Sequence, residues 1–204
     1  MTAERRSLEV RLADYRRDLE FTATLRGESL CFRSTWGLFS PRQVDEGTTL
    51  LLDCVEVDPA DDCLDLGCGY GVIGLTLARL APQGRTLMVD KDVVAVEYAN
   101  ANAAANGIGN AQAMLSNGLD AVPEAQRFDV IASNLPAKVG NELLTLLIAD
   151  AHAHLNPGGR LYLVTLSGMR RFIERTCVEV FGNYDKAKQG RQHTVALAKR
   201  PSAP

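Results

Sequence analysis

Residues 65–74 read Asp-Leu-Gly-Cys-Gly-Tyr-Gly-Val-Ile-Gly. The stretch begins inside a short apolar run at residues 63–66, which predicts a buried strand, and leads into a helical pattern at residues 71–80. The glycines allow the backbone to turn tightly and to approach a ligand without interference from a Cβ atom. The helix that follows offers free N–H groups and the positive end of its dipole. The stretch therefore predicts a strand, a ligand-binding glycine loop and a helix.

An acidic residue, Asp90, ends the next predicted strand. An acid at this place can accept hydrogen bonds from both hydroxyls of a ribose, so the pair of features indicates a nucleoside-containing cofactor. The spacing of Gly69, Gly71 and Gly74 also fits a dinucleotide fingerprint. However, the Asp65 carboxylate would repel a pyrophosphate, whereas it would attract an ammonium group.

Strand and helix patterns alternate through the rest of the chain. Strands are predicted at residues 63–66, 86–90, 111–115, 128–133 and 160–166. Helices are predicted at residues 44–55, 71–80, 92–106, 140–155 and 169–181. Residues 184–188 and 194–199 are expected to form an antiparallel pair. Repeated βα units predict an α/β fold, a doubly wound and mostly parallel sheet, which binds ligands at the carboxyl ends of its strands.

The N-terminal residues 1–42 are predicted to form an extension ahead of the domain at residues 43–204. Charged residues interspersed with leucines indicate a helix or arm over residues 4–20. Alternation over residues 21–33 indicates a β-hairpin with Gly27 in its turn. The sequence therefore divides into an arm with a hairpin and one cofactor-binding domain.

Length and composition agree with one globular domain. The 204 residues are 46% hydrophobic and 23% charged, which argues against disorder. The net charge of −3 is unevenly spread. Residues 1–42 carry eight Arg against six acids, residues 43–164 six basic residues against sixteen acids, and residues 165–204 eight against three. The basic ends could dock an anion such as nucleic acid, or they could be solvated faces.

Other sequence features argue against a membrane, a disulfide scaffold and a metal. No run of eighteen apolar residues is present, and the charged start lacks the apolar segment of a signal peptide. Three histidines lack metal-ligand spacing. The odd number of cysteines, without a CxxC pair, indicates reduced thiols and a cytoplasmic protein. The cysteines are Cys31, Cys54, Cys63, Cys68 and Cys177.

In these motifs, residues 32–199 resemble the class I S-adenosylmethionine-dependent methyltransferases. More narrowly, they resemble the small methyltransferase domain of the ribosomal RNA guanine exocyclic-amine methyltransferases. The resemblance implies a Rossmann-like seven-stranded sheet with an antiparallel last strand, and S-adenosylmethionine as the cofactor. The stretches that carry it are Gly37–Ser40, Val44–Thr48, Asp65–Gly74, Asp90, Ser116-Asn117 and Ser133–Pro136.

The resemblance places the acceptor at Asn134, Leu135 and Pro136. In the family, the Asn side-chain oxygen and the next backbone carbonyl accept the two hydrogens of the acceptor amine, which turns the nitrogen lone pair toward the methyl group. Family members typically carry two prolines after the Asn, followed by an apolar or aromatic residue, whereas this sequence has Leu135 in place of one proline and no aromatic ring at Ala137. Three interpretations of this difference stay open. The acceptor could be a nucleobase amine whose base stacks on Phe39 or Trp36, it could be a different amine or a small molecule, or the protein could bind the cofactor and methylate poorly.

The resemblance also implies which residues bind the cofactor. Asp65 and the glycine backbone would hold its methionine end, and Asp90 its ribose. Ser116 and Asn117 would lie near the adenine unless they form an ordinary turn, and Phe39 would contact the cofactor unless it is a core residue. Asp45 and Thr48 are expected to cap a helix. The implied cofactor-binding residues are Asp65, Gly67, Cys68, Gly69, Tyr70, Gly71, Asp90, Lys91, Ser116, Asn117, Asn134 and Phe39.

The function expected from these features is methyl transfer from S-adenosylmethionine to an exocyclic amine, with guanine in ribosomal RNA favoured. The alternatives are methylation of a small-molecule or protein amine, and a cofactor-binding partner protein without turnover. The expected partner is RNA, with no membrane and no metal, and the chain could be a monomer or a homodimer. Basic residues that could form an RNA groove or a solvated surface are Lys138, Arg170, Arg171, Lys186, Lys188 and Arg191.

Overall fold

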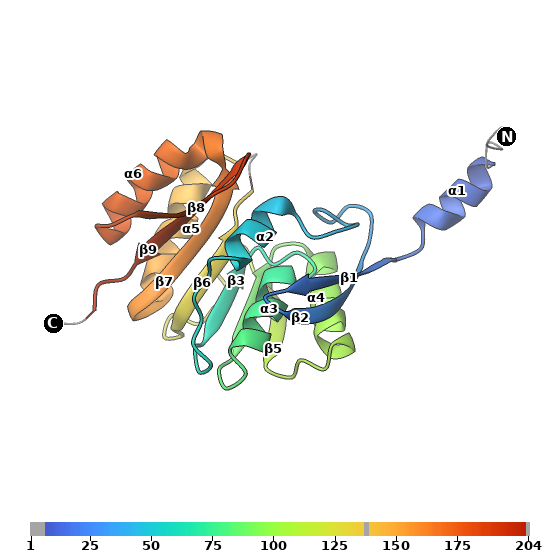
Figure 1. Ribbon diagram of the computed structural model, residues 1–204, viewed down its shortest axis with the longest axis horizontal. Coiled ribbons are helices and arrows are strands. Elements are labelled where there is room, and N and C mark those ends of the chain that lie inside the picture. Colours follow the sequence, from blue (N-terminus) through green and yellow to red (C-terminus); the bar gives the residue numbers. More distant parts are fainter. Residues whose placement is uncertain (1–6, 137–138, 203–204) are drawn as a thin grey trace.

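A seven-stranded sheet forms the centre of the computed structural model, which describes residues 7–136 and 139–202 (Figure 1). The strands stand in the order β5-β4-β3-β6-β7-β9-β8. The pairs among β3 to β7 are parallel, and β9 runs antiparallel between β7 and β8. The predicted α/β fold with an antiparallel last strand is confirmed. The strands are β3 Cys63–Leu66, β4 Thr86–Asp90, β5 Ala111–Leu115, β6 Phe128–Asn134, β7 Leu155–Leu166, β8 Asp185–Gln189 and β9 His193–Lys199.

Helices cover both faces of the sheet because its central strands are apolar on both sides. Along β3, Cys63 belongs to one hydrophobic cluster and Leu64 to the other. The first cluster joins the sheet to α2 Glu46–Leu52, α3 Val72–Leu80, α4 Val93–Ala105 and the hairpin of β1 Leu19–Leu25 and β2 Glu28–Ser34. The second joins it to α5 Asn141–His154 and α6 Arg170–Phe181, which follows a short 3₁₀ helix, Ser167–Met169.

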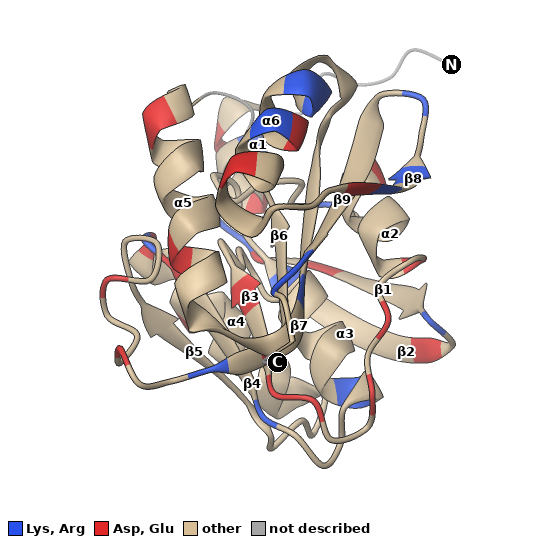
Figure 2. Ribbon diagram, turned by 90° about the vertical axis from the view of Figure 1, so that its left-hand side faces the viewer, with Lys and Arg blue, Asp and Glu red and all other residues tan. Residues whose placement is uncertain are grey.

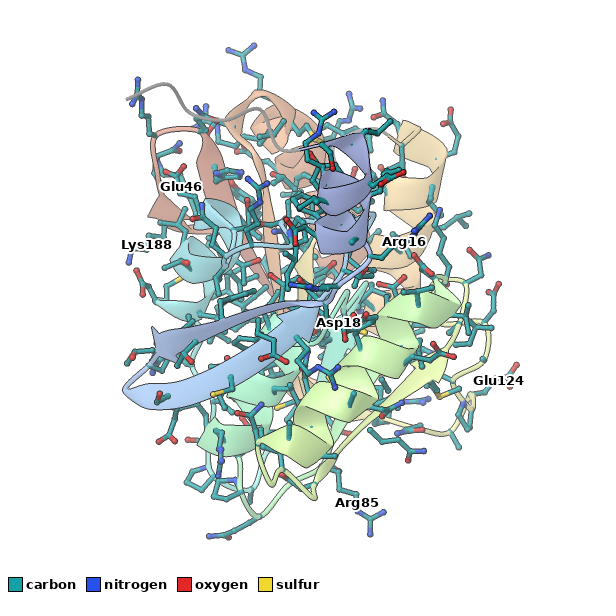
Figure 3. All side chains as sticks on the ribbon, turned by 90° about the vertical axis from the view of Figure 1, so that its right-hand side faces the viewer. Arg16, Asp18, Glu46, Arg85, Glu124 and Lys188 are labelled. Atoms are coloured by element: carbon teal, nitrogen blue, oxygen red, sulfur yellow. The ribbon has the colours of Figure 1, made fainter. Side chains whose placement is uncertain are left out.

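The N-terminal helix α1, Leu8–Tyr15, projects from the body of the molecule (Figure 1). It buries none of its residues. Of the helix or arm expected over residues 4–20, residues 8–15 are helical, and Leu19 already pairs with Ser34 in the hairpin. Figure 3 shows Asp18 below α1 and beside α4. Its carboxylate accepts hydrogen bonds from Arg33 in the hairpin and from the Tyr98 hydroxyl of α4, which fixes the foot of the arm.

The hairpin belongs to the same hydrophobic cluster as α2, α3 and α4. Leu25, Leu30 and Phe32 are buried in that cluster. The predicted hairpin is confirmed, whereas the division of the chain at residue 42 stays a prediction. No helix among the described residues is long and apolar enough to cross a membrane.

Two element boundaries differ from the prediction for local reasons. The helix expected over residues 44–55 is shorter, because the Asp45 carboxylate accepts the Gly47 N–H and caps α2 there. Residues 156–159 separate the predicted helix over residues 140–155 from the predicted strand over residues 160–166, but they lie within β7. Phe128 pairs with Leu155 and Val130 with Arg160, so the intervening residues form an irregularity in the pairing.

Candidate functional site

The glycine loop lies between β3 and α3, at the carboxyl edge of the sheet. Gly67, Gly69 and Gly71 have φ angles of +78°, +53° and +96°, which side chains with a Cβ atom rarely adopt. A Cβ atom on Gly67 or Gly69 would meet nothing within 4 Å. The loop is thus wound around open space. The Gly69 N–H donates to the Asp90 carboxylate at 2.9 Å, which ties the loop to the end of β4.

Asp65 lies at the base of the loop and is fully buried. Its Oδ2 accepts the Gly74 N–H of α3 at 2.7 Å, whereas its Oδ1 is buried with no hydrogen-bond partner in the described structure. Burial raises the pKa of the Asp65 carboxyl to about 7, and the Gly74 hydrogen bond lowers it only in part. The nearby Asp90 carboxylate raises it further. This carboxyl therefore gains from a cation placed beside it.

The ends of β4 and β5 carry the next predicted residues. The second oxygen of Asp90 accepts the Asp92 N–H at 3.0 Å, and Lys91 is exposed. The Ser116 hydroxyl donates to the Gly118 carbonyl and accepts the Ala121 N–H. The Asn117 amide donates to Asp120 at 3.1 Å. The side chains of Ser116 and Asn117 thus bond within a local turn, the alternative left open by the sequence, and their contact with an adenine stays a prediction.

Tyr70 and Cys68 point into protein. The Tyr70 ring packs on Phe21 and Phe32, and its hydroxyl donates to the Ser40 carbonyl at 2.9 Å. Burial raises the pKa of the Tyr70 hydroxyl and of the Cys68 thiol well above their usual values. Cys68 is therefore held as an uncharged thiol beside the loop. The roles predicted for Tyr70 and Cys68 toward the cofactor stay predictions.

Asn134 ends β6, the strand next to β3, so its side chain lies on the same edge as the glycine loop. Its Nδ2 donates to the Asp45 carboxylate and to the Thr48 hydroxyl, each at 3.0 Å. Both partners belong to the first turn of α2 or its cap. Asp45 caps α2 as predicted, whereas Thr48 lies inside the helix and does not cap it. Their contacts with Asn134 lay beyond the prediction, because these residues are 89 and 86 positions from it. No local pattern could have signalled them.

Leu135 takes the place of the family's first proline and is held in another way. Its N–H donates to the Val164 carbonyl of β7 at 3.1 Å, a bond that a proline could not make. Its side chain is buried in the second hydrophobic cluster. The backbone after Asn134 is therefore fixed by a hydrogen bond and by packing. Pro136 is exposed, and Ala137 and Lys138 lie outside the described residues.

Two aromatic residues precede α2. Phe39 is 67% exposed, so the core position considered for it is wrong, and its ring is free to meet a ligand. Trp36 is 38% exposed, with the Arg42 guanidinium 4.6 Å from its ring centre and Tyr15 against its edge. The loop with Phe39 is tied to the glycine loop by the Tyr70–Ser40 bond and to Asn134 through Asp45.

The family model described as methyltransferase small domain matches residues 29–196 of this chain, and so covers the glycine loop and Asn134 together. The chain belongs to the methyltransferase small-domain family. The expected enzyme class and the resemblance drawn from the sequence are thereby confirmed.

Several relatives of this methyltransferase chain are named for ribosomal RNA. It is 36% identical over 168 residues to the ribosomal RNA small subunit methyltransferase C of Hamiltonella defensa, which covers 79% of this chain and 48% of that protein. The enzyme of the same name from Pseudomonas syringae pv. syringae is 34% identical over 169 residues. That match covers 81% of this chain and 49% of that protein. An uncharacterised Bacillus subtilis protein, YbxB, is 37% identical over 141 residues, 69% of this chain and 70% of that protein.

A solved structure agrees in fold. The 16S ribosomal RNA guanine methyltransferase RsmC of T. thermophilus, in complex with AdoMet and guanosine, superposes with a TM-score of 0.82 at 30% identity. The match covers 90% of this chain and 50% of that one. The chain thus spans about half the length of the RsmC proteins it matches. The cofactor expected from the sequence agrees with the AdoMet of this relative.

Proposed function

We propose that this chain transfers a methyl group from S-adenosylmethionine to the exocyclic amine of a guanine in small-subunit ribosomal RNA. The observation that carries the proposal is the adjacency of β3 and β6, in which Asp65 pairs with Ala132. The glycine loop follows one strand and Asn134 ends the other. A cofactor on the loop and an amine at Asn134 would therefore meet at one edge of the sheet. The RsmC structure with AdoMet and guanosine supports this choice of donor and acceptor.

The residues around the glycine loop fit S-adenosylmethionine. The open space over Gly67 and Gly69 leaves room for a ligand against the backbone. The cofactor carries a sulfonium and an ammonium, the Asp90 carboxylate contacts the loop backbone at Gly69, and the buried Asp65 carboxyl lies at the base of the loop. Asp65 has an oxygen without a partner, and Asp90 keeps lone pairs that two N–H groups leave unused. We infer that Asp65 faces the methionine end and Asp90 the ribose.

The acceptor side would act by orienting a weak nucleophile. A guanine amine is a poor nucleophile because its lone pair is delocalised into the ring. Asn134 Oδ1 and the Leu135 carbonyl would accept its two hydrogens and turn the lone pair toward the methyl carbon. When bound, the cofactor supplies a methyl group on a sulfonium, a good leaving group. The C–N bond would form as the C–S bond breaks, and the amine would then lose one proton to solvent.

The charge distribution supports an anionic acceptor. Acids gather at the ends of β3 and β4, where Asp65, Asp90 and Asp92 lie. Basic residues lie past the ends of β7 and β8, where Figure 2 shows blue on α6 and on the turn between β8 and β9. These are Arg170, Arg171 and Arg191. A cationic cofactor and an RNA backbone would thus occupy different halves of one edge. The exposed Phe39 offers a ring for base stacking.

The test is a methyl-transfer assay with the purified chain, radiolabelled S-adenosylmethionine and small-subunit ribosomal RNA, offered both free and as particles. Digestion to nucleosides should yield guanosine methylated on its exocyclic amine. Asn134→Ala should lower kcat by about 100-fold or more, since one oriented polar group is removed. Asn141→Ala, an exposed amide at the start of α5, is the matched control. Label in protein or small amines but not in RNA would contradict the proposed acceptor.

A further inference from the structure

We propose that Asp45 and Thr48 are positioning residues that hold the Asn134 amide with its oxygen toward the acceptor amine. The inference rests on the proposed function, because it assigns a role at the same site. An asparagine amide carries a donor branch and an acceptor branch on one rotatable bond. Only the oxygen branch can accept the hydrogens of an acceptor amine. Whatever decides the rotation of this amide therefore decides whether the site is competent.

The rotation is decided by Asp45 at the cap of α2, because the Thr48 hydroxyl can either donate or accept a hydrogen bond. An ionised carboxylate such as that of Asp45 only accepts hydrogen bonds, so it requires the Nδ2 branch of Asn134 on its side. The distance from Nδ2 to Asp45 Oδ2 is 3.0 Å, and that to the Thr48 hydroxyl oxygen is also 3.0 Å. Both hydrogens of the amide nitrogen are thus engaged. The Asn134 oxygen is left on the branch that points away from these two partners.

The partners are themselves held in place. Asp45 Oδ2 also accepts the N–H groups of Gly47 and Thr48, at 2.8 and 3.3 Å, as the N-cap of α2. Thr48 is only 6% exposed. A Cβ atom on Gly47 would lie 2.8 Å from Asp45 Oδ2 and 3.0 Å from His193 Cδ2, so the carboxylate and the imidazole are packed against that glycine. The start of α2 thus gives Asn134 a fixed support.

The experiment compares hydroxyl variants at two neighbouring threonines. Thr48→Val keeps the shape and removes the hydroxyl, and we expect kcat to fall 10- to 100-fold. KM for RNA and the affinity for S-adenosylmethionine should change less than twofold. Thr48→Ser should restore most of the lost rate. Thr49→Val is the matched control, because the exposed Thr49 hydroxyl bonds only the Asp45 backbone carbonyl and does not reach Asn134.

A variant at Asp45 tests the second partner. Asp45→Ser keeps an N-cap residue for α2 but shortens the side chain away from Asn134. We expect its kcat to fall as in Thr48→Val while its melting temperature stays near that of the wild type. In an Asn134→Ala background, neither Thr48→Val nor Asp45→Ser should lower kcat further, since both act through Asn134. A further tenfold loss in that background would overturn the assignment.

A readout without turnover separates this inference from the proposed function. The Asn134 side-chain amide protons, assigned in ¹⁵N-labelled protein by their loss in Asn134→Ala, should exchange slowly with water. Exchange should accelerate at least tenfold in Thr48→Val and stay unchanged in Thr49→Val. If the wild type methylates no RNA while this difference in exchange is found, the proposed RNA methylation is wrong, whereas the proposed anchoring of the Asn134 amide is supported. Equal exchange and equal kcat in both variants would refute the positioning role.

Discussion

At the scale of single residues, the buried Asp65 couples the site to pH. The carboxyl has no solvent contact, one N–H partner on Oδ2 and an Oδ1 without a partner among the described atoms. Desolvation raises its pKa in the folded chain to about 7, against an ordinary value of 3.8. The folded state therefore binds this proton more tightly than the unfolded chain does. Its contribution to stability is complete below pH 4 and is lost as the pH rises through about 7.

We expect this loss to disappear in Asp65→Asn, whose amide does not titrate. Between pH 5 and pH 8 the free energy of unfolding of the wild type should fall relative to that of the variant, by up to about 3 kcal/mol. Denaturant titrations at both pH values measure this difference. Asp185→Asn, on the exposed strand β8, should keep the wild-type pH dependence. Parallel curves for the wild type and Asp65→Asn would show that the Asp65 pKa is unshifted.

At the scale of elements, Gly74 sets how closely α3 packs on the sheet. A Cβ atom here would fall on the Met88 side chain and 3.2 Å from Asp65 Cβ. Met88 is fully buried, so its chain has no free space to move into. The third glycine of the motif therefore serves helix packing. Gly67 and Gly69, earlier in the loop, border open space instead.

Gly74→Ala should accordingly lower the free energy of unfolding by about 1–3 kcal/mol, because it overpacks the contact between α3 and β4. Gly109→Ala is the matched control, since a Cβ atom there meets nothing within 4 Å and its φ is not positive. Thermal or denaturant unfolding of both variants checks the expectation. A Gly74→Ala protein as stable as the control would mean that α3 can shift outward at little cost.

The sequence predicted some elements to the residue and missed the ends of others. The bounds of β4 and β5 agree because short apolar strands flanked by glycines and polar residues leave little choice. The helix or arm expected at the N-terminus ran on to residue 20 because Leu19 fits a helical spacing as well as a strand. The link from Asn134 to Asp45 and Thr48 was out of reach, since it joins segments 89 and 86 positions apart. Such contacts exist only after the chain has folded.

At the scale of the whole molecule, the opposite charges along the sheet edge would make binding of the proposed RNA acceptor dependent on salt. We expect the logarithm of the association constant for small-subunit ribosomal RNA to fall linearly with the logarithm of the salt concentration. Alanine at Arg170, Arg171 or Arg191 should each reduce that slope by about 0.7–0.9. Arg85→Ala is the control, because Arg85 precedes β4 at the opposite edge, where Figure 3 labels it at the foot of the molecule. A slope unchanged by all three variants would remove this surface from the RNA contact.

The segment from Ser40 to Thr48 touches both halves of the site. One end accepts the Tyr70 hydroxyl of the glycine loop, and the other holds the Asn134 amide. A ligand that restrains one end of the segment would lower the conformational entropy that is lost when a second ligand binds at the other end. We therefore expect the binding of donor and acceptor to be coupled through this segment, and linkage requires the same factor in both directions. We expect the demethylated product, which keeps the ammonium and the ribose, to act on the same segment and so to inhibit turnover.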